Sequence, residues 1–330
     1  MVDISVNYMG LELKSPFIAA SSGYTADLEK IVALARCGAG AVVLKSLFEE
    51  QISIDTGFLQ TAATEHTETL DYLHRYVADH TVEEYLELIK EAKRRSGIPV
   101  IASINCYSNS CWVNFASEIE RAGADALELN IYTMPLNVGK TGLELEGEYL
   151  KTVKQVAGNL SIPVAVKIGE NYTSLNNFVH ALQGYGAKGV VLFNRFFSPD
   201  ISLKSLKIVP ANPFSTKNEY LKELRWIAIL SSQLRNFGLS ASTGVYDPSS
   251  GIKLLLAGAG TVQLCSVLYK QGPFVLQDFN AALKEFMKSK GFRRIADFCG
   301  MLNYSNISNP AEYERGQFLK TAQHYSKDIK

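Results

Sequence analysis

Short runs of apolar, mainly β-branched residues recur along the chain, and each run ends in a polar residue. The clearest are AVVLKS at 41–46, PVIASIN at 99–105, ALELN at 126–130, PVAVKIG at 163–169, GVVLFN at 189–194 and TVQLCS at 261–266. A parallel strand covered on both faces reads as such a continuous run, and in α/β barrels the chemistry lies where the strands end. The pattern therefore predicts parallel strands that bring polar side chains to one shared mouth.

Segments with helical spacing separate these strands. They cover residues 28–36, 82–95, 112–121, 143–157, 175–185, 220–235, 249–257 and 274–290. With further strands at 15–21 and 238–243, eight strands alternate with eight helices, which predicts an α/β fold of the closed (β/α)8 TIM barrel type. We expect a single barrel domain over residues 1–291 and a short helical C-terminal extension over residues 292–330.

Two connections, at residues 48–81 and 195–219, are longer than the usual links of a barrel. Connections of this length without secondary structure are uncommon unless they serve as lids or binding loops. We therefore expect both of them to cover the mouth of the barrel.

The composition favours a small-molecule ligand over nucleic acid or membrane. Hydrophobic residues make up 47% of the chain, and 33 basic side chains balance 33 acidic ones, so no net charge attracts nucleic acid or anionic lipid. The five scattered cysteines contain no CxxC pair, which predicts no metal site and suits the reducing cytoplasm. No apolar run is long enough for a membrane span, and charged residues near the start argue against a signal peptide.

Lysines end two of the strands, Lys45 in VVLKS and Lys167 in VAVKIG. A lysine at the inward end of a barrel strand must be paired or desolvated, and either state suits it to stabilise an anion or to form a Schiff base. The alternative for each is a solvated lysine in the following loop. Two such lysines in one mouth favour the functional interpretation.

Asparagines end three strands, at Asn105, Asn130 and Asn194. A primary amide offers donors and an acceptor to the edge of a planar heterocycle such as a pyrimidine or a flavin. Capping of the strand or a bond to loop backbone is the alternative for each. After the last two strands, Thr243, Gly244 and Ser266 are small and can expose donors where barrels usually hold a phosphate.

In order and spacing, the segments SPFIAASSG, AVVLKS, ELN, VAVKIG, LFN, STGV and LAGAGTVQLCSVLYKQGP resemble the dihydroorotate dehydrogenase family of FMN-dependent barrels, over most of residues 11–300. The resemblance implies FMN across the barrel mouth, with Lys167 against its pyrimidine ring. It assigns cofactor contacts to Ala20, Ser21, Lys45, Ser46, Asn105, Asn130, Lys167, Thr243, Gly244, Cys265 and Ser266. It also implies hydride transfer to flavin N5 and a homodimer. Since no apolar run could span a membrane, we expect a soluble electron acceptor.

The chain departs from the family where the family carries its catalytic base. After Asn130 the family has a cysteine or serine, whereas here that position falls on Thr133 or Met134. A threonine hydroxyl is a poor base unless a neighbour activates it, and methionine cannot act as one. Thr133, with Lys45 and Lys167, is nevertheless our candidate catalytic set.

The substrate site is also remodelled relative to the family. Candidate substrate-binding residues are Asn130, Asn137, Asn194 and Arg195, the last as a partner for an anionic group. His66 and His74 in the first long connection are possible replacement bases, and solvated loop histidines are the plainer interpretation.

The leading hypothesis is an FMN-dependent oxidoreductase of CH–CH groups that acts on dihydroorotate or a related cyclic anion, in pyrimidine biosynthesis by resemblance. A barrel lyase or aldolase with a Schiff base on Lys167 is an alternative. A flavin-binding relative without dihydroorotate turnover is another.

Overall fold

The computed structural model describes residues 2–48, 82–106, 112–132, 134–196 and 198–314. Its central sheet consists of parallel strands in the order β4, β3, β13, β12, β9, β8, β7, β6, β5, and β4 also pairs with β6, which closes the sheet into a barrel. The strands are β3 (Phe17–Ala19), β4 (Val42–Val43), β5 (Leu47–Phe48), β6 (Val100–Cys106), β7 (Ala126–Ile131), β8 (Val164–Ile168), β9 (Gly189–Leu192), β12 (Gly238–Ser242) and β13 (Thr261–Leu264).

The predicted second strand is divided into β4 and β5, and both parts pair with β6. Counted as one strand, they leave eight parallel strands among the described residues, so the predicted (β/α)8 barrel is confirmed.

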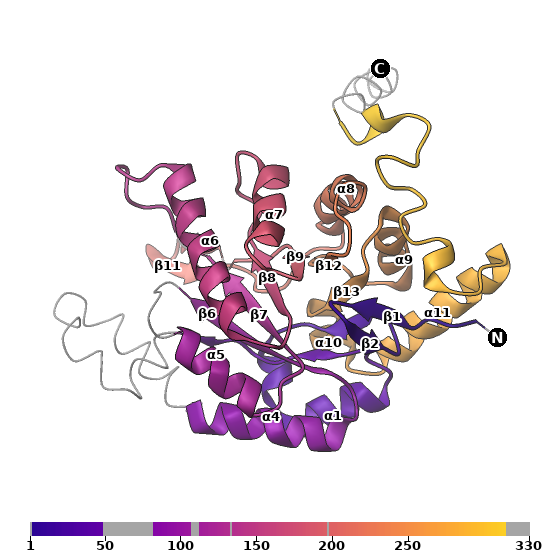
Figure 1. Cartoon of the computed structure of the whole chain (residues 1–330), viewed down its shortest axis with the longest axis horizontal. Coiled ribbons are helices and arrows are strands. Elements are labelled where there is room, and N and C mark those ends of the chain that lie inside the picture. The colour runs from indigo at the N-terminus through magenta and orange to yellow at the C-terminus, as the bar shows by residue number, and fades with distance from the viewer. Residues whose placement is uncertain (1, 49–81, 107–111, 133, 197, 315–330) are drawn as a thin grey trace.

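Helices follow the strands and surround the sheet (Figure 1). They are α1 (Leu28–Arg36), α4 (Val82–Ser96), α5 (Trp112–Arg121), α6 (Gly142–Asn159), α7 (Leu175–Gly184), α8 (Tyr220–Ser231), α9 (Pro248–Ala257), α10 (Ser266–Gln271) and α11 (Val275–Lys290), with a 3₁₀ turn η1 at Gly23–Ala26. Helix α10 was not predicted, because six residues are too few to carry a helical period. It begins at Ser266, so the predicted strand 261–266 ends two residues earlier, at Leu264.

An antiparallel hairpin at the N-terminus, β1 (Val6–Tyr8) and β2 (Leu11–Leu13), covers the amino ends of the strands. A Cβ on Gly238, the first residue of β12, would lie 2.8 Å from the ring of Tyr8, so only glycine allows this approach. At this end of the barrel interior, Tyr8 and Leu13 of the hairpin form an apolar cluster with Ile18, Ala41, Val43, Ile101 and Ala126. The hairpin therefore closes the end of the barrel opposite to the mouth.

The second long connection contains a second antiparallel hairpin, β10 (Pro199–Ser202) and β11 (Lys207–Pro210). We predicted no secondary structure there, and this was wrong. The hairpin is exposed on both faces, with Ile201 and Ile208 65% and 78% accessible, so it lacks the alternation of a half-buried strand. The connection at 48–81 lies outside the described residues, apart from Phe48 at the end of β5.

Beyond α11, the described part of the C-terminal segment contains two 3₁₀ turns, η3 (Ile295–Asp297) and η4 (Pro310–Glu312). Backbone bonds from Gly300 to Leu255 and from Leu302 to Leu256 hold this segment against α9. Its separation from the barrel as an extension stays a prediction.

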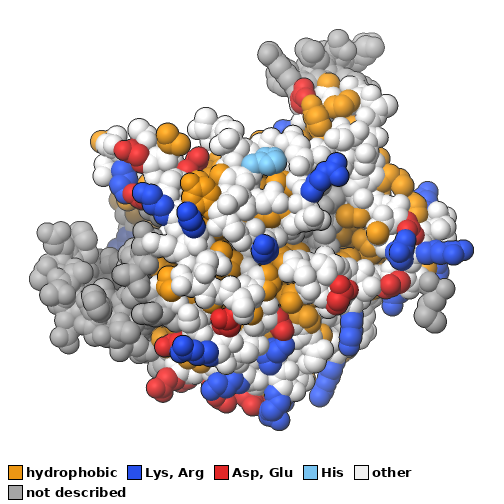
Figure 2. Space-filling view, viewed as in Figure 1, with side chains coloured by type: hydrophobic (Ala, Val, Ile, Leu, Met, Phe, Trp, Pro, Cys, Tyr) orange, Lys and Arg blue, Asp and Glu red, His pale blue; other side chains and the backbone are white. Residues whose placement is uncertain are grey.

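Basic and acidic side chains are interspersed on the face seen in Figure 2, in keeping with the balanced charge of the chain. Within the described ranges, no helix combines the length and apolar character that a membrane crossing needs. In the same ranges, histidine, cysteine and acidic side chains form no group of three or more that could hold a metal ion.

Candidate active site

The register of the sheet aligns three of the predicted residues at the carboxyl ends of neighbouring strands. Asn105 on β6 is the pairing partner of Asn130 on β7, which in turn pairs with Lys167 on β8. Lys167 is buried, with 6% of its surface accessible, and both asparagines are half-buried. The strands thus bring one cation and two amides together at one level, as their terminal positions predicted.

Lys167 is paired by two residues that the sequence analysis did not select, Glu128 and Gln263. Its Nζ donates to Gln263 Oε1 at 3.1 Å and lies 3.6 Å from Glu128 Oε1, while Gln263 Nε2 donates to Glu128 Oε2 at 2.7 Å. Glu128 and Gln263 are each 1% accessible. A signal existed in the sequence, because a glutamate or glutamine inside an otherwise apolar strand needs a buried partner.

A chain of serine hydroxyls connects the ends of three strands. Ser21 Oγ lies 3.1 Å from Ser46 Oγ, which lies 2.7 Å from Ser103 Oγ. Tyr85 on α4 fixes Ser103, since its hydroxyl accepts from the Ser103 amide and donates to the Ser103 carbonyl. Ser21 and Ser46 were predicted at this place, and Ser103 was missed although it lies one alternation before Asn105.

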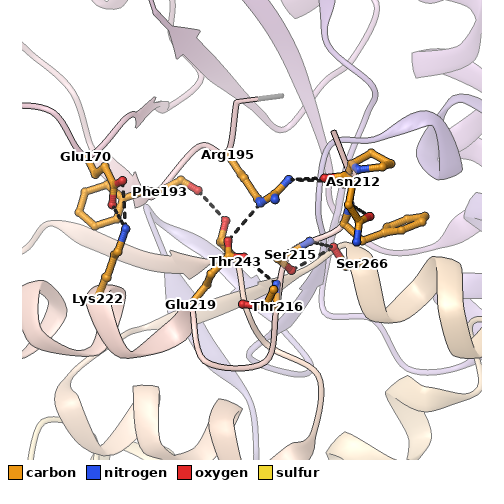
Figure 3. Close-up of polar contacts among 12 residues, drawn as sticks. Glu170, Phe193, Arg195, Asn212, Ser215, Thr216, Glu219, Lys222, Thr243 and Ser266 are labelled. Atoms are coloured by element: carbon orange, nitrogen blue, oxygen red, sulfur yellow. Dashed lines mark hydrogen bonds and ion pairs between the residues drawn. The ribbon is translucent and has the colours of Figure 1, made fainter. Parts of the chain in front are cut away.

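Asn194 and Arg195 follow β9 and point to different partners. Asn194 Nδ2 donates to Asn130 Oδ1 at 2.7 Å, so these two predicted amides meet. The Arg195 guanidinium instead pairs with Glu219 at 3.1 Å and donates to the carbonyls of Asn212 and Pro213 (Figure 3). In this arrangement Arg195 holds its own connecting segment together.

The backbone after β12 turns through two residues with positive φ, Thr243 at 85° and Gly244 at 73°. Threonine is rare in this conformation, and here its hydroxyl donates to the Phe193 carbonyl at 3.0 Å (Figure 3). Gly244 is buried, and a Cβ there would lie 2.2 Å from the Tyr220 amide at the start of α8. The turn therefore lies directly against the first residues of α8.

Ser266, Ser215 and Cys265 lie together after β13. The Ser215 amide and hydroxyl both donate to Ser266 Oγ, at 3.1 and 3.0 Å, and Tyr246 holds Ser215 through its carbonyl. Figure 3 shows the two serines facing each other. Burial raises the pKa of the Cys265 thiol, and the positive charge of Lys167 partly opposes this increase.

The other predicted residues are more scattered. Ala20 is fully buried after β3, and Lys45 is half-buried between β4 and β5. Asn137 is exposed, and its side chain accepts from the Gly139 amide within its own loop, so the structure does not bring it to Asn130 and Asn194. Thr133 lies outside the described residues.

The candidate replacement bases His66 and His74 also lie outside the described residues. Met134, the alternative for the base position, is described and is 55% accessible. Tyr132 before it stacks on Phe196, with ring centroids 3.4 Å apart.

The fold and this set of residues define an α/β-barrel protein with a buried ammonium, amides and hydroxyls at the carboxyl ends of its strands. The sequence model of the dihydroorotate dehydrogenase family matches residues 3–287. The chain therefore belongs to the dihydroorotate dehydrogenase family.

The similar proteins are named either as dihydropyrimidine dehydrogenases or as dihydroorotate dehydrogenases. The NAD-dependent dihydropyrimidine dehydrogenase subunit PreA of Escherichia coli (strain K12) is 25% identical, over 94% of this chain and 79% of its own length. The dihydroorotate dehydrogenase B (NAD(+)) catalytic subunit of Thermoplasma acidophilum is 25% identical, over 91% of this chain and 99% of its own. A putative dihydroorotate dehydrogenase A (fumarate) of Aeropyrum pernix is 30% identical, over 66% of this chain and 72% of its own.

Proposed function

We propose that this protein is an FMN-dependent oxidoreductase that oxidises a CH–CH group of dihydroorotate or of a related cyclic dihydropyrimidine. The observation that carries the proposal is the row formed by Asn105, Asn130 and buried Lys167 at one level of the mouth. Membership of the dihydroorotate dehydrogenase family supports the reaction class, and the names of the relatives support both substrates.

The residues present fit FMN in their chemistry. The row of one ammonium and two amides suits the edge of a flat ring that carries both carbonyl and N–H groups. On the opposite side of the barrel, the Ser266 hydroxyl and the close-packed turn at Thr243 and Gly244 lie at the ends of strands seven and eight, where barrels commonly bind phosphate. When bound, FMN supplies an acceptor for hydride and a store of electrons for a second substrate.

Within this site each residue has a definite task. Lys167 holds a positive charge, already fixed by Glu128 and Gln263, where it stabilises negative charge on a neighbouring group. Asn130 and Asn194 hold each other, so their remaining amide groups are oriented for a planar ligand. The serine chain of Ser21 and Ser46 keeps a hydroxyl network beside the mouth.

The proton that leaves the substrate needs a base, and Thr133 is the proposed one by its position in the family motif. A threonine acts only with an activating neighbour. If no base operates, the protein binds flavin without turnover of dihydroorotate. The observation that supports this second function is that the sequence has Thr133 and Met134 where the family motif has a cysteine or serine.

The first test is the visible spectrum of the purified protein after reconstitution with FMN. We expect a flavin spectrum in stoichiometric amount. Lys167→Met should weaken FMN binding ~10–100-fold, the loss expected for a charged hydrogen bond of ~1.5–3 kcal/mol. Lys188→Met removes an exposed lysine just before β9 and should leave the affinity unchanged. A colourless protein that takes up no FMN would refute the proposal.

The second test is anaerobic mixing of the FMN-loaded protein with dihydroorotate and, separately, with 5,6-dihydrouracil. Bleaching by the first supports a dihydroorotate dehydrogenase function, and bleaching by the second alone supports a dihydropyrimidine substrate. Bound flavin that neither compound bleaches supports the binding function without turnover. Borohydride trapping of a substrate on Lys167 would instead support the lyase.

The electron acceptor is proposed to be a soluble molecule or a partner protein, since two relatives are named as subunits. A homodimer and a cytoplasmic location remain part of the proposal. The free cysteines Cys37, Cys265 and Cys299 suit a reducing compartment.

A further inference from the structure

Beneath the candidate cofactor site lies a buried carboxylate for which the proposed reaction has no use. Glu128 is on β7, two residues before Asn130, and its side chain points into the barrel. It is 1% accessible. Burial raises the pKa of Tyr8 on the N-terminal hairpin, and the negative charge of Glu128 adds to this increase. A buried charge of this kind is costly unless it is paired.

The pairing of Glu128 is divided between its two oxygens. Oε2 accepts from Gln263 Nε2 at 2.7 Å, whereas Oε1 accepts no hydrogen bond from the described residues and lies 3.6 Å from Lys167 Nζ. Gln263 donates to the carboxylate through its nitrogen and accepts from the ammonium through its oxygen. The amide thus connects the two charges and fixes the direction of both.

We propose that Glu128 and Gln263 are positioning residues, which hold Lys167 against the flavin and balance its charge, so that the site presents an ion pair and not a free cation. This inference rests on the proposed function, because it concerns the property of a bound FMN. Glu128 touches neither substrate nor cofactor in this proposal and acts only through Lys167.

Charge balance has a measurable consequence for the reduction potential of bound FMN. Reduction adds negative charge, so a nearby positive charge raises the potential and a nearby negative charge lowers it. Glu128→Gln removes the negative partner, retains the shape and leaves Lys167 uncompensated. Lys167→Met leaves Glu128 uncompensated. The two variants should shift the potential in opposite directions.

The experiment measures the midpoint potential of FMN in the wild type, E128Q, K167M, the double variant and S240A. Ser240 is buried beside Tyr8 in the barrel interior and carries no charge, so S240A controls for the loss of a polar group there. At a fixed solution potential, we expect E128Q to raise, and K167M to lower, the ratio of reduced to oxidised flavin by about tenfold. This corresponds to a shift of ~30 mV in the midpoint potential of a two-electron couple. The double variant should return close to the wild type.

Two results would overturn the inference. One is an E128Q potential that is unchanged or lower while FMN stays bound, as a purely structural role predicts. If E128Q does not fold, the comparison of K167M with K167M/E128Q decides, because removal of the carboxylate must still raise the potential in that background. The other is a double variant in which the two shifts fail to cancel.

A cofactor-free measurement separates this inference from the proposed function. In the apoprotein, E128Q and K167M should each lower the free energy of unfolding, and the double variant should lose less than the sum, as paired charges require. A wild type that binds no FMN refutes the proposed function and with it the flavin part of the inference. Bound FMN without opposite shifts refutes the inference alone.

Discussion

Gly244 offers a sharp test of how the mouth is built. Its φ is +73°, and a Cβ would lie 2.2 Å from the Tyr220 amide nitrogen and 2.9 Å from the Glu219 carbonyl carbon. Both are backbone atoms at the start of α8, so no side chain can rotate away to make room. Gly244→Ala should therefore combine backbone strain with a collision that displaces the first turn of α8.

The magnitude has two parts. An L-residue in the left-handed region costs ~1–2 kcal/mol, and overpacking at a close contact typically costs a further ~1–3 kcal/mol. Gly291 is the matched control, because its φ is +76° and nothing lies within 4 Å of its Cβ position. Gly291→Ala should carry only the first part, so the two variants should differ by ~1–3 kcal/mol.

Urea unfolding of both variants, with and without FMN, measures this difference. We also expect G244A to bind FMN more weakly than G291A, since Gly244 itself belongs to the turn proposed to hold the phosphate. Equal losses of stability in the two variants would refute the collision, and unchanged FMN affinity in G244A would argue against a phosphate site at this turn.

Two further predictions concern the carboxyl groups of Asp125 and Glu223. Asp125 accepts hydrogen bonds from Lys93 at 2.6 and 2.8 Å and from the Val100 amide at 2.7 Å. In urea unfolding, D125A should lower stability by ~1–3 kcal/mol because it leaves the amide unsatisfied, and K93M should lower it by only ~0–1 kcal/mol. Equal losses in the two variants would contradict this. Burial raises the pKa of Glu223 from 4.5 to about 8, so between these pH values the folded state retains a proton that the unfolded state loses. The free energy of unfolding should therefore fall as pH rises from 4.5 to about 8, by up to ~1.4 kcal/mol per pH unit. E223Q should flatten this dependence, and a pH profile identical to that of the wild type would exclude Glu223 as its source.

The barrel could be predicted because strands buried on both faces leave continuous apolar runs in the sequence, whereas amphipathic helices leave a helical period. The row of Asn105, Asn130 and Lys167 could be predicted for the same reason, since parallel strands end at one level and their terminal residues become neighbours. Glu128 and Gln263 were not predicted because they lie inside their strands and not at the strand ends. A rule that treats every buried polar residue as paired would have found them.

The contacts of Arg195 could not be predicted in this way. Its charge suggested an anionic ligand, but its guanidinium meets Glu219 and two carbonyls of a segment that carries an exposed hairpin. Which charges meet in such a segment depends on the conformation of the whole connection between Arg195 and Glu219, and no sequence period records it. Exposed hairpin strands also lack the alternation that would identify them.

The barrel interior divides into two layers with different demands. Below, apolar side chains such as Ile18, Val43 and Ile101 pack on the hairpin of Tyr8 and stabilise the fold. Above, Glu128 and the residues it pairs form a polar layer that stability alone would not select, because apolar replacements of a buried ion pair are often neutral or stabilising. A function at the mouth is the simpler reason for its presence. Because this layer consists of strand residues, a change in the loops that follow the strands can alter contacts to a substrate without altering the layer.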